Sequence, residues 1–146
     1  MKIYFDTCTL QRPLDDHTQV RIALEAEAVL TLLALCTHGK AHLIASDVVI
    51  YETSNNPHPK RRTFVREIIM QAAEIIPFTE EITQRAREFE QSGIKGVDTL
   101  QLASAEIYGV EYFCTCDDRF YRRAVALRRS VIKVRTPLAL AQEILP

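Results

Sequence analysis

The chain has 146 residues, of which 47% are hydrophobic and 25% are charged, and its net charge is -1. These values fit one folded domain, residues 1–146, whose core is large enough to need no disulfide or structural metal. No stretch approaches the ~18 apolar residues of a membrane span, and the acidic Asp6 comes too early for a signal peptide. We therefore expect a cytoplasmic protein with no membrane contact.

The chain begins with short apolar segments that alternate with helical patterns. In order, we expect a strand Lys2–Phe5, a loop Gln11–Asp16, a helix Val20–Leu35, a strand Ala41–Ala45 and a helix capped by Ser46. In the long helix, Leu24, Ala28, Leu32 and Leu35 are predicted to form the buried stripe. Pro57 then breaks the pattern, because proline pushes the residue before it out of helical geometry.

The same alternation continues to the end of the chain. In order, we expect a helix at about Arg62–Ala73, a strand Ile75–Phe78, a helix from Thr79 through Gln91, a helix Val97–Tyr108, a strand Glu111–Thr115, a helix Asp118–Leu127, a strand Val131–Val134 and a helix from Pro137. Pro77 indicates that the third strand lies near a sheet edge. Strands that alternate with helices predict an α/β/α sandwich with a central parallel sheet of four to five strands.

The distribution of charge and the spacing of the cysteines indicate which partners and metal sites to expect. Residues 117–146 contain seven Lys and Arg against three acidic residues, a balance of +4, whereas residues 1–116 hold 11 basic and 16 acidic residues. A basic end facing an acidic body is compatible with a phosphate-bearing partner, and equally with a solvated helix face. Cys8, Cys36, Cys114 and Cys116 show no CxxC pair and no ligand spacing with the histidines, so we expect reduced thiols and no zinc site.

Four acidic residues from distant parts of the chain are expected to converge at the edge where an open parallel sheet binds ligands, beyond the carboxyl ends of its strands. Asp6 follows the first predicted strand and Asp117 the fourth, Asp98 opens the helix before that fourth strand, and Glu52 lies on the helix after the second. Carboxylates gathered so closely repel one another, and oxygen-only ligands suit Mg²⁺ or Mn²⁺. Each acid also has a structural explanation, as a turn, a helix start or a cap, and Asp118 competes with Asp117 for the capping role.

Four motifs resemble the PIN-domain family. They are Asp6–Thr7, Ser46–Glu52, Val97–Ala103 and the Thr-x-Asp-x-x-Phe segment Thr115–Phe120. They follow the family's order and spacing over nearly the whole chain. The resemblance implies an α/β/α sandwich and an Mg²⁺- or Mn²⁺-dependent endoribonuclease. Many stand-alone members are VapC-type toxins of toxin–antitoxin pairs, commonly dimeric and inhibited by a small antitoxin.

The resemblance also assigns roles to residues. It implies that the metal is held by Asp6, Asp98 and Asp117, with Glu52 contributing directly or through water. It implies three supporting residues, Thr7, Thr115 and Asp118, of which Thr115 would orient the site from its inner edge. Cys8 is a departure, because many relatives have Asn or Ser there and a thiol is a poorer hydrogen-bond partner.

Basic residues near the acids are candidates for binding RNA phosphates. Arg12 lies on the loop after Asp6, and Arg119, Arg122 and Arg123 lie on the helix that leaves Asp117. Residues three and four apart share a helix face, so Arg119 with Arg122 or Arg123 is expected to form one ridge. The run Lys60–Arg62 is a further candidate. A solvated face or a dimer contact is the alternative explanation of these arginines.

Several other functions fit the sequence less well. A phosphatase of the haloacid dehalogenase kind requires Asp-x-Asp after the first strand, where this chain has Asp6-Thr7-Cys8. A phospho-accepting receiver domain requires a lysine after its last strand, whereas Lys133 lies within one. Two alternatives remain open, namely a catalytically silent module that binds RNA or a protein, and a housekeeping RNA-processing nuclease.

Overall fold

The computed structural model describes residues 1–127 and 132–145, and its five strands form one sheet in the order β3-β2-β1-β4-β5. The strands are β1 (Lys2–Phe5), β2 (His42–Ser46), β3 (Glu74–Ile76), β4 (Tyr112–Cys114) and β5 (Lys133–Arg135). All four neighbouring pairs are parallel. The predicted parallel sheet is confirmed, and β3 lies at an edge as Pro77 indicates.

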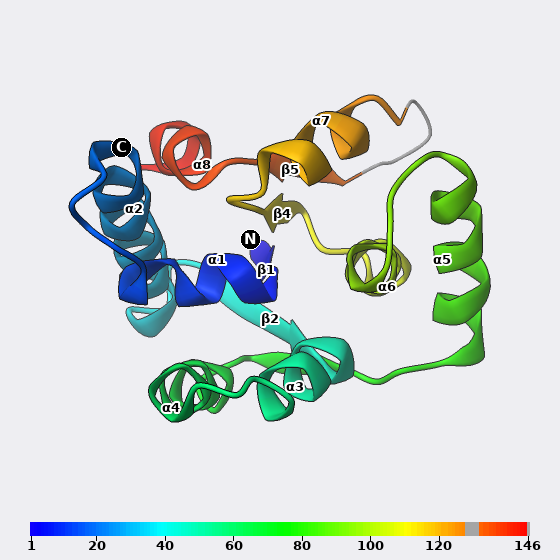
Figure 1. Ribbon diagram of the computed structural model, residues 1–146, viewed down its shortest axis with the longest axis horizontal. Coiled ribbons are helices and arrows are strands. Elements are labelled where there is room, and N and C mark those ends of the chain that lie inside the picture. Colours follow the sequence, from blue (N-terminus) through cyan, green and yellow to red (C-terminus); the bar gives the residue numbers. More distant parts are fainter. Residues whose placement is uncertain (128–131, 146) are drawn as a thin grey trace.

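Helices cover both faces of this sheet (Figure 1). They are α1 (Thr7–Gln11), α2 (Val20–Thr37), α3 (Asp47–Ser54), α4 (Pro59–Ile69), α5 (Glu80–Gln91), α6 (Val97–Tyr108), α7 (Asp118–Val125) and α8 (Pro137–Ile144), with a short 3-10 helix η1 (Arg12–Leu14). Helices α2 and α8 pack together on one side, and α6 lies on the other with α5 outside it (Figure 1). No helix of the described segments is long and apolar enough to cross a membrane.

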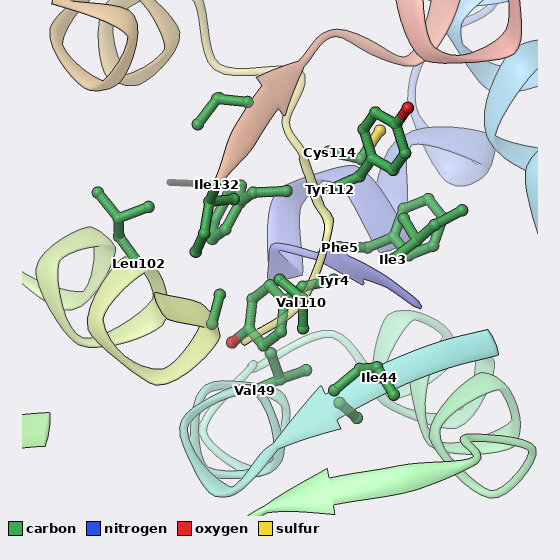
Figure 2. Close-up of a cluster of buried hydrophobic side chains, with 14 of the residues drawn as sticks. Ile3, Tyr4, Phe5, Ile44, Val49, Leu102, Val110, Tyr112, Cys114 and Ile132 are labelled. Carbon is green, nitrogen blue, oxygen red and sulfur yellow. The ribbon is translucent and has the colours of Figure 1, made fainter. Parts of the chain in front are cut away.

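The central strand β1 anchors the core. Ile3, Tyr4 and Phe5 are at most 1% exposed, because both faces of the sheet are covered (Figure 2). The Tyr4 ring stacks on Phe113 of β4 with centroids 5.1 Å apart, and Phe113 contacts Phe120 of α7 at 5.2 Å. Burying each such side chain stabilises the fold by about 1.5–3 kcal/mol. The residues that follow β1 and β4 are therefore held by a rigid frame.

The predicted loop Gln11–Asp16 is correct only in part, because Gln11 ends a helix and Arg12–Leu14 form a 3-10 helix. A five-residue helix, α1, begins directly after Asp6, and η1 follows it. The Asp6 side chain accepts a hydrogen bond from the Thr9 amide at 3.1 Å and caps α1. So short a helix has no apolar periodicity, so only its capping residue marks it in the sequence.

The predicted buried stripe of α2 is partly wrong. Ala28 and Leu32 are buried as expected, but Leu24 is 51% exposed while the neighbouring Glu25 is 3% exposed. Glu25 tolerates burial because Arg12 and Arg21 lie 3.4 and 3.7 Å from its carboxylate. The buried face is thus shifted around the helix by one residue.

Other bounds move by a few residues. Helix α4 begins at Pro59, ahead of the predicted start, because proline fits the first helical position. Strand β3 ends at Ile76, directly before Pro77. Strand β5 begins at Lys133, and the predicted start of the fifth strand, Val131, lies outside the described residues.

Candidate active site

Asp6 is fixed at the carboxyl end of β1. Its carboxylate is 3% exposed and accepts hydrogen bonds from the Thr9 amide at 3.1 Å, from the Thr9 hydroxyl and from the Cys8 thiol at 3.3 Å. Thr115 also hydrogen-bonds this carboxylate. Burial raises the pKa of Asp6, and these donors partly offset the rise. Asp6 is therefore an oriented carboxylate and not a solvated turn residue.

Glu52 approaches from α3. Ser46 starts this helix by accepting a hydrogen bond from the Val49 amide at 3.1 Å. The Glu52 Oε1 atom accepts from the Thr7 hydroxyl at 2.6 Å and from the Gln101 side-chain amide. Burial raises the pKa of Glu52, the Thr7 hydrogen bond lowers it, and the charge of Asp6 raises it further. Glu52 thus lies within the field of Asp6.

Asp98 lies in the first turn of α6 and is half-buried. Its pKa is raised to about 7. Burial is the largest cause, and the charges of Asp6, Asp117 and Glu52 raise it further. All three carboxylates therefore act on Asp98, although they come from distant parts of the chain. The helix start itself depends on Gly96, whose φ of 58° lies in the left-handed region that glycine adopts readily.

Asp117 caps α7 and faces the same cluster. Its carboxylate accepts from the Phe120 amide at 3.0 Å, and its own amide donates to the Thr115 hydroxyl at 3.1 Å. Asp98 and Asp117 together border a hollow of 230 Å³, which we call the basic hollow because Lys95, Arg119 and Arg123 also line it. The capping role does not remove Asp117 from the cluster.

Three predicted residues lie elsewhere. Asp118 points away and forms a bidentate pair with Arg21, at 2.7 and 2.5 Å. Arg12 is held between Asp15, at 2.8 Å, and Glu25, so its guanidinium faces the protein. Arg122 adds to the field at Asp118 and does not line the basic hollow. Asp118 and Arg12 thus have partners on other elements, Arg21 and Glu25 of α2.

Comparison with known proteins supports the motif assignment. The family model "PIN domain" matches residues 3–126. The chain belongs to the PIN domain family. No curated protein sequence matches it.

Three solved structures share the fold of this PIN domain. VapBC2 from Rickettsia felis, bound to a DNA fragment from their promoter, has a TM-score of 0.62 and 17% identity, over 93% of this chain and 98% of that chain. FitAB bound to an IR36 DNA fragment has a TM-score of 0.61 and 18% identity, over 92% of this chain and 94% of that chain. DNA-bound VapBC from Salmonella typhimurium has a TM-score of 0.60 and 14% identity, over 94% of this chain and 98% of that chain. At such identities the likeness concerns the fold.

Two residues that the sequence interpretation omits complete the site of this PIN domain. Thr9 is buried, donates its hydroxyl to Asp6 and accepts from the Cys116 amide at 2.9 Å, so it ties the ends of β1 and β4 together. Gln101 is buried as well, and its amide donates to Glu52 and, at 3.2 Å, to Thr7. The sequence could have indicated Thr9 and Gln101, because each is a polar residue three positions after a candidate acid, Asp6 or Asp98. Residues three apart lie on the same face of a helix.

The four acids have the chemistry of a divalent-cation site. Within residues 1–127 and 132–145, none of them forms an ion pair with Lys or Arg. No three acidic, histidine or cysteine side chains of that part of the chain are close enough to hold one ion together. The donors are nevertheless all oxygens, and their mutual repulsion is uncompensated at Asp98. This combination fits a hydrated Mg²⁺ or Mn²⁺, which retains several of its waters.

Proposed function

We propose that this PIN domain is an Mg²⁺- or Mn²⁺-dependent endoribonuclease. The observation that carries the proposal is that the charges of Asp6, Asp117 and Glu52 act on the half-buried Asp98, while none of the four acids has a basic partner among the described residues. Asp6, Asp98 and Asp117 would hold the cation, with Glu52 contributing directly or through water. A bound divalent cation supplies charge that offsets the phosphodiester and lowers the pKa of an attacking water.

The protein's own groups have distinct tasks in this proposal. Thr9 and Thr115 orient Asp6, while Thr7 and Gln101 orient Glu52, so neither carboxylate needs to reorganise on binding. Lys95, Arg119 and Arg123 border the acids and have no acidic partner among the described residues. We assign to them the phosphates of the RNA strand that flank the scissile bond.

Cleavage of a single-stranded RNA of mixed sequence tests this function. Wild-type protein is expected to cut in the presence of Mn²⁺ and to stop in chelator, and Asp98→Asn is expected to abolish cutting. Glu81→Gln is the matched control, because Glu81 is an exposed acid in the first turn of α5 and lies outside the cluster. An Asp98→Asn protein that cuts at the wild-type rate would contradict the mechanism.

We further propose that the nuclease is the toxin of a toxin–antitoxin pair and a homodimer. The support is the fold shared with FitAB and VapBC and an exposed apolar surface. Tyr51 and Phe78 are 69% and 51% exposed and border a hollow of 460 Å³ with Val48, Val97 and Leu100. Light scattering of the wild type and Tyr51→Glu tests the dimer, and an unchanged mass in the variant would remove this surface from it.

A neighbouring gene whose small product blocks cleavage would identify the antitoxin.

A further inference from the structure

A second hollow adjoins the acids at Glu52. It has a volume of 390 Å³ and lies between α1, α3 and α4. The residues that matter here are Thr7, Gln11, Asp15, Glu52, Asn56 and Arg61, and we call this space the Gln11 hollow. Because Thr7 and Glu52 form part of its wall, a group bound there would touch the proposed site directly.

The side chain of Gln11 is fixed by its neighbours. Its Oε1 atom accepts from Asn56 Nδ2 and from Arg61 Nη1, each at 3.2 Å. Asn56 is itself held, because its Oδ1 accepts from the His58 amide at 2.9 Å. Among the described residues, no acceptor takes the two hydrogens of Gln11 Nε2. The hollow therefore presents an amide donor whose orientation is already set.

Asp15 supplies the complementary acceptor. Its Oδ1 lies 2.8 Å from Arg61 Nη1, and its Oδ2 lies 2.8 Å from Arg12 Nη1. Each carboxylate oxygen offers two lone pairs, so both can accept a further hydrogen bond. The two arginines neutralise the charge of Asp15 and hold its plane. Asp15 in the Gln11 hollow is thus charge-paired, and Glu52 is the acid of its wall that has no basic partner among the described residues, whereas the basic hollow carries three cations without acidic partners.

We propose that the Gln11 hollow is a base-recognition subsite that takes a guanine of single-stranded RNA beside the scissile phosphate. The proposal rests on the ribonuclease function proposed above. Guanine offers N1–H and N2–H₂ as donors to the Asp15 carboxylate and O6 as an acceptor for Gln11 Nε2. Adenine lacks both O6 and N1–H, and uracil lacks the amino group. Unpaired bases present these edges freely, as recognition of single-stranded RNA requires.

Binding of labelled RNA octamers in the cleavage-inactive Asp98→Asn protein tests the subsite. We expect an octamer with one guanosine among uridines to bind about tenfold or more tightly than oligouridine. Inosine, which lacks only the N2 amino group, should lose much of this preference. These comparisons use one protein, so no folding defect can imitate them. Equal affinity for all three octamers would overturn the proposal.

Gln11→Leu in the same background should reduce the preference for guanosine, because the O6 atom loses its donor while Asp15 keeps its two contacts. Gln91→Leu is the matched control, because Gln91 is exposed at the end of α5. Melting curves verify that both variants are folded, and a preference unchanged by Gln11→Leu would overturn the assignment.

The failure of this proposal is distinguishable from failure of the nuclease. Cleavage by wild-type protein with no guanosine at a fixed distance from the cut would overturn the subsite and leave the nuclease intact. Guanosine-selective binding without cleavage by the wild type would overturn the nuclease and leave the subsite.

Discussion

Neutralising Asp98 should stabilise the metal-free protein while abolishing its activity. The pKa of Asp98 rises from an ordinary 3.8 to about 7 in the folded protein, through burial and the charges of Asp6, Asp117 and Glu52. A folded state that binds a proton more tightly than the unfolded state is stabilised at low pH. That stability is lost as pH rises from about 4 to 7 and stays lost above it.

The size of the effect follows from the shift. Each pKa unit corresponds to about 1.36 kcal/mol, so the full difference would be ~4 kcal/mol. Asp98 is only partly buried, and solvent screening reduces this figure to ~1–2 kcal/mol. Asp98→Asn also loses a favourable interaction with the α6 dipole of ~0.3–1 kcal/mol. The net gain of about 1 kcal/mol at pH 8 raises the melting temperature by roughly 2–4 °C.

Melting curves recorded with EDTA at pH 8 and pH 5 test this reasoning. Asp98→Asn should melt above the wild type at pH 8, and the difference should shrink at pH 5. Glu81→Gln should show no such gain, because its carboxyl lies outside the cluster. An Asp98→Asn protein that melts at or below the wild-type temperature at pH 8 would refute the repulsion on which the site rests.

Three further predictions concern metal, RNA and the supporting residues. Asp6→Asn should weaken Mn²⁺ binding measured by calorimetry, and Zn²⁺ should not be preferred because the four proposed ligands are all carboxylates. Replacing Arg119 and Arg123 together by Ala in the inactive background should flatten the slope of log RNA affinity against log salt by roughly 1.4, whereas Arg122→Ala should leave it unchanged. Gln101→Leu should lower Mn²⁺ affinity by about 10–100-fold without unfolding the protein, because Glu52 loses an orienting donor.

For each of these three predictions, one result would contradict it. Equal Mn²⁺ affinity in Asp6→Asn and the wild type would remove Asp6 from the site. An unchanged salt slope in the double arginine variant would place the RNA path elsewhere. A folded Gln101→Leu protein that binds Mn²⁺ as tightly as the wild type would show that Gln101 only packs in the core. Gln91→Leu is the control for the effect of a Gln→Leu change on Mn²⁺ affinity.

The features that the sequence predicts well are local ones. Asp6 and Asp117 follow apolar strands, and the carboxyl ends of parallel strands meet at one sheet edge, so their convergence can be anticipated from the alternation of elements alone. The prediction of β3 at an edge likewise depends on Pro77 and nothing distant. Thr115, adjacent to β4, takes its inner position for the same reason.

The features that the sequence misses depend on partners distant along the chain. Glu25 is buried instead of Leu24 because Arg12 reaches it from η1. Asp118 is drawn from the cluster by Arg21, which is 97 positions away in sequence. No periodicity or spacing encodes such pairs, because each is decided when separate elements pack. The same packing pairs Arg12 with Asp15 and Glu25.

Anomalous diffraction from crystals grown with Mn²⁺ tests the central claim most directly. We expect a manganese peak among the carboxylates of Asp6, Asp98, Asp117 and Glu52, and its disappearance in Asp98→Asn crystals grown under the same conditions. A fully occupied peak elsewhere on the protein, with none among these four acids, would contradict the claim that they form one metal site.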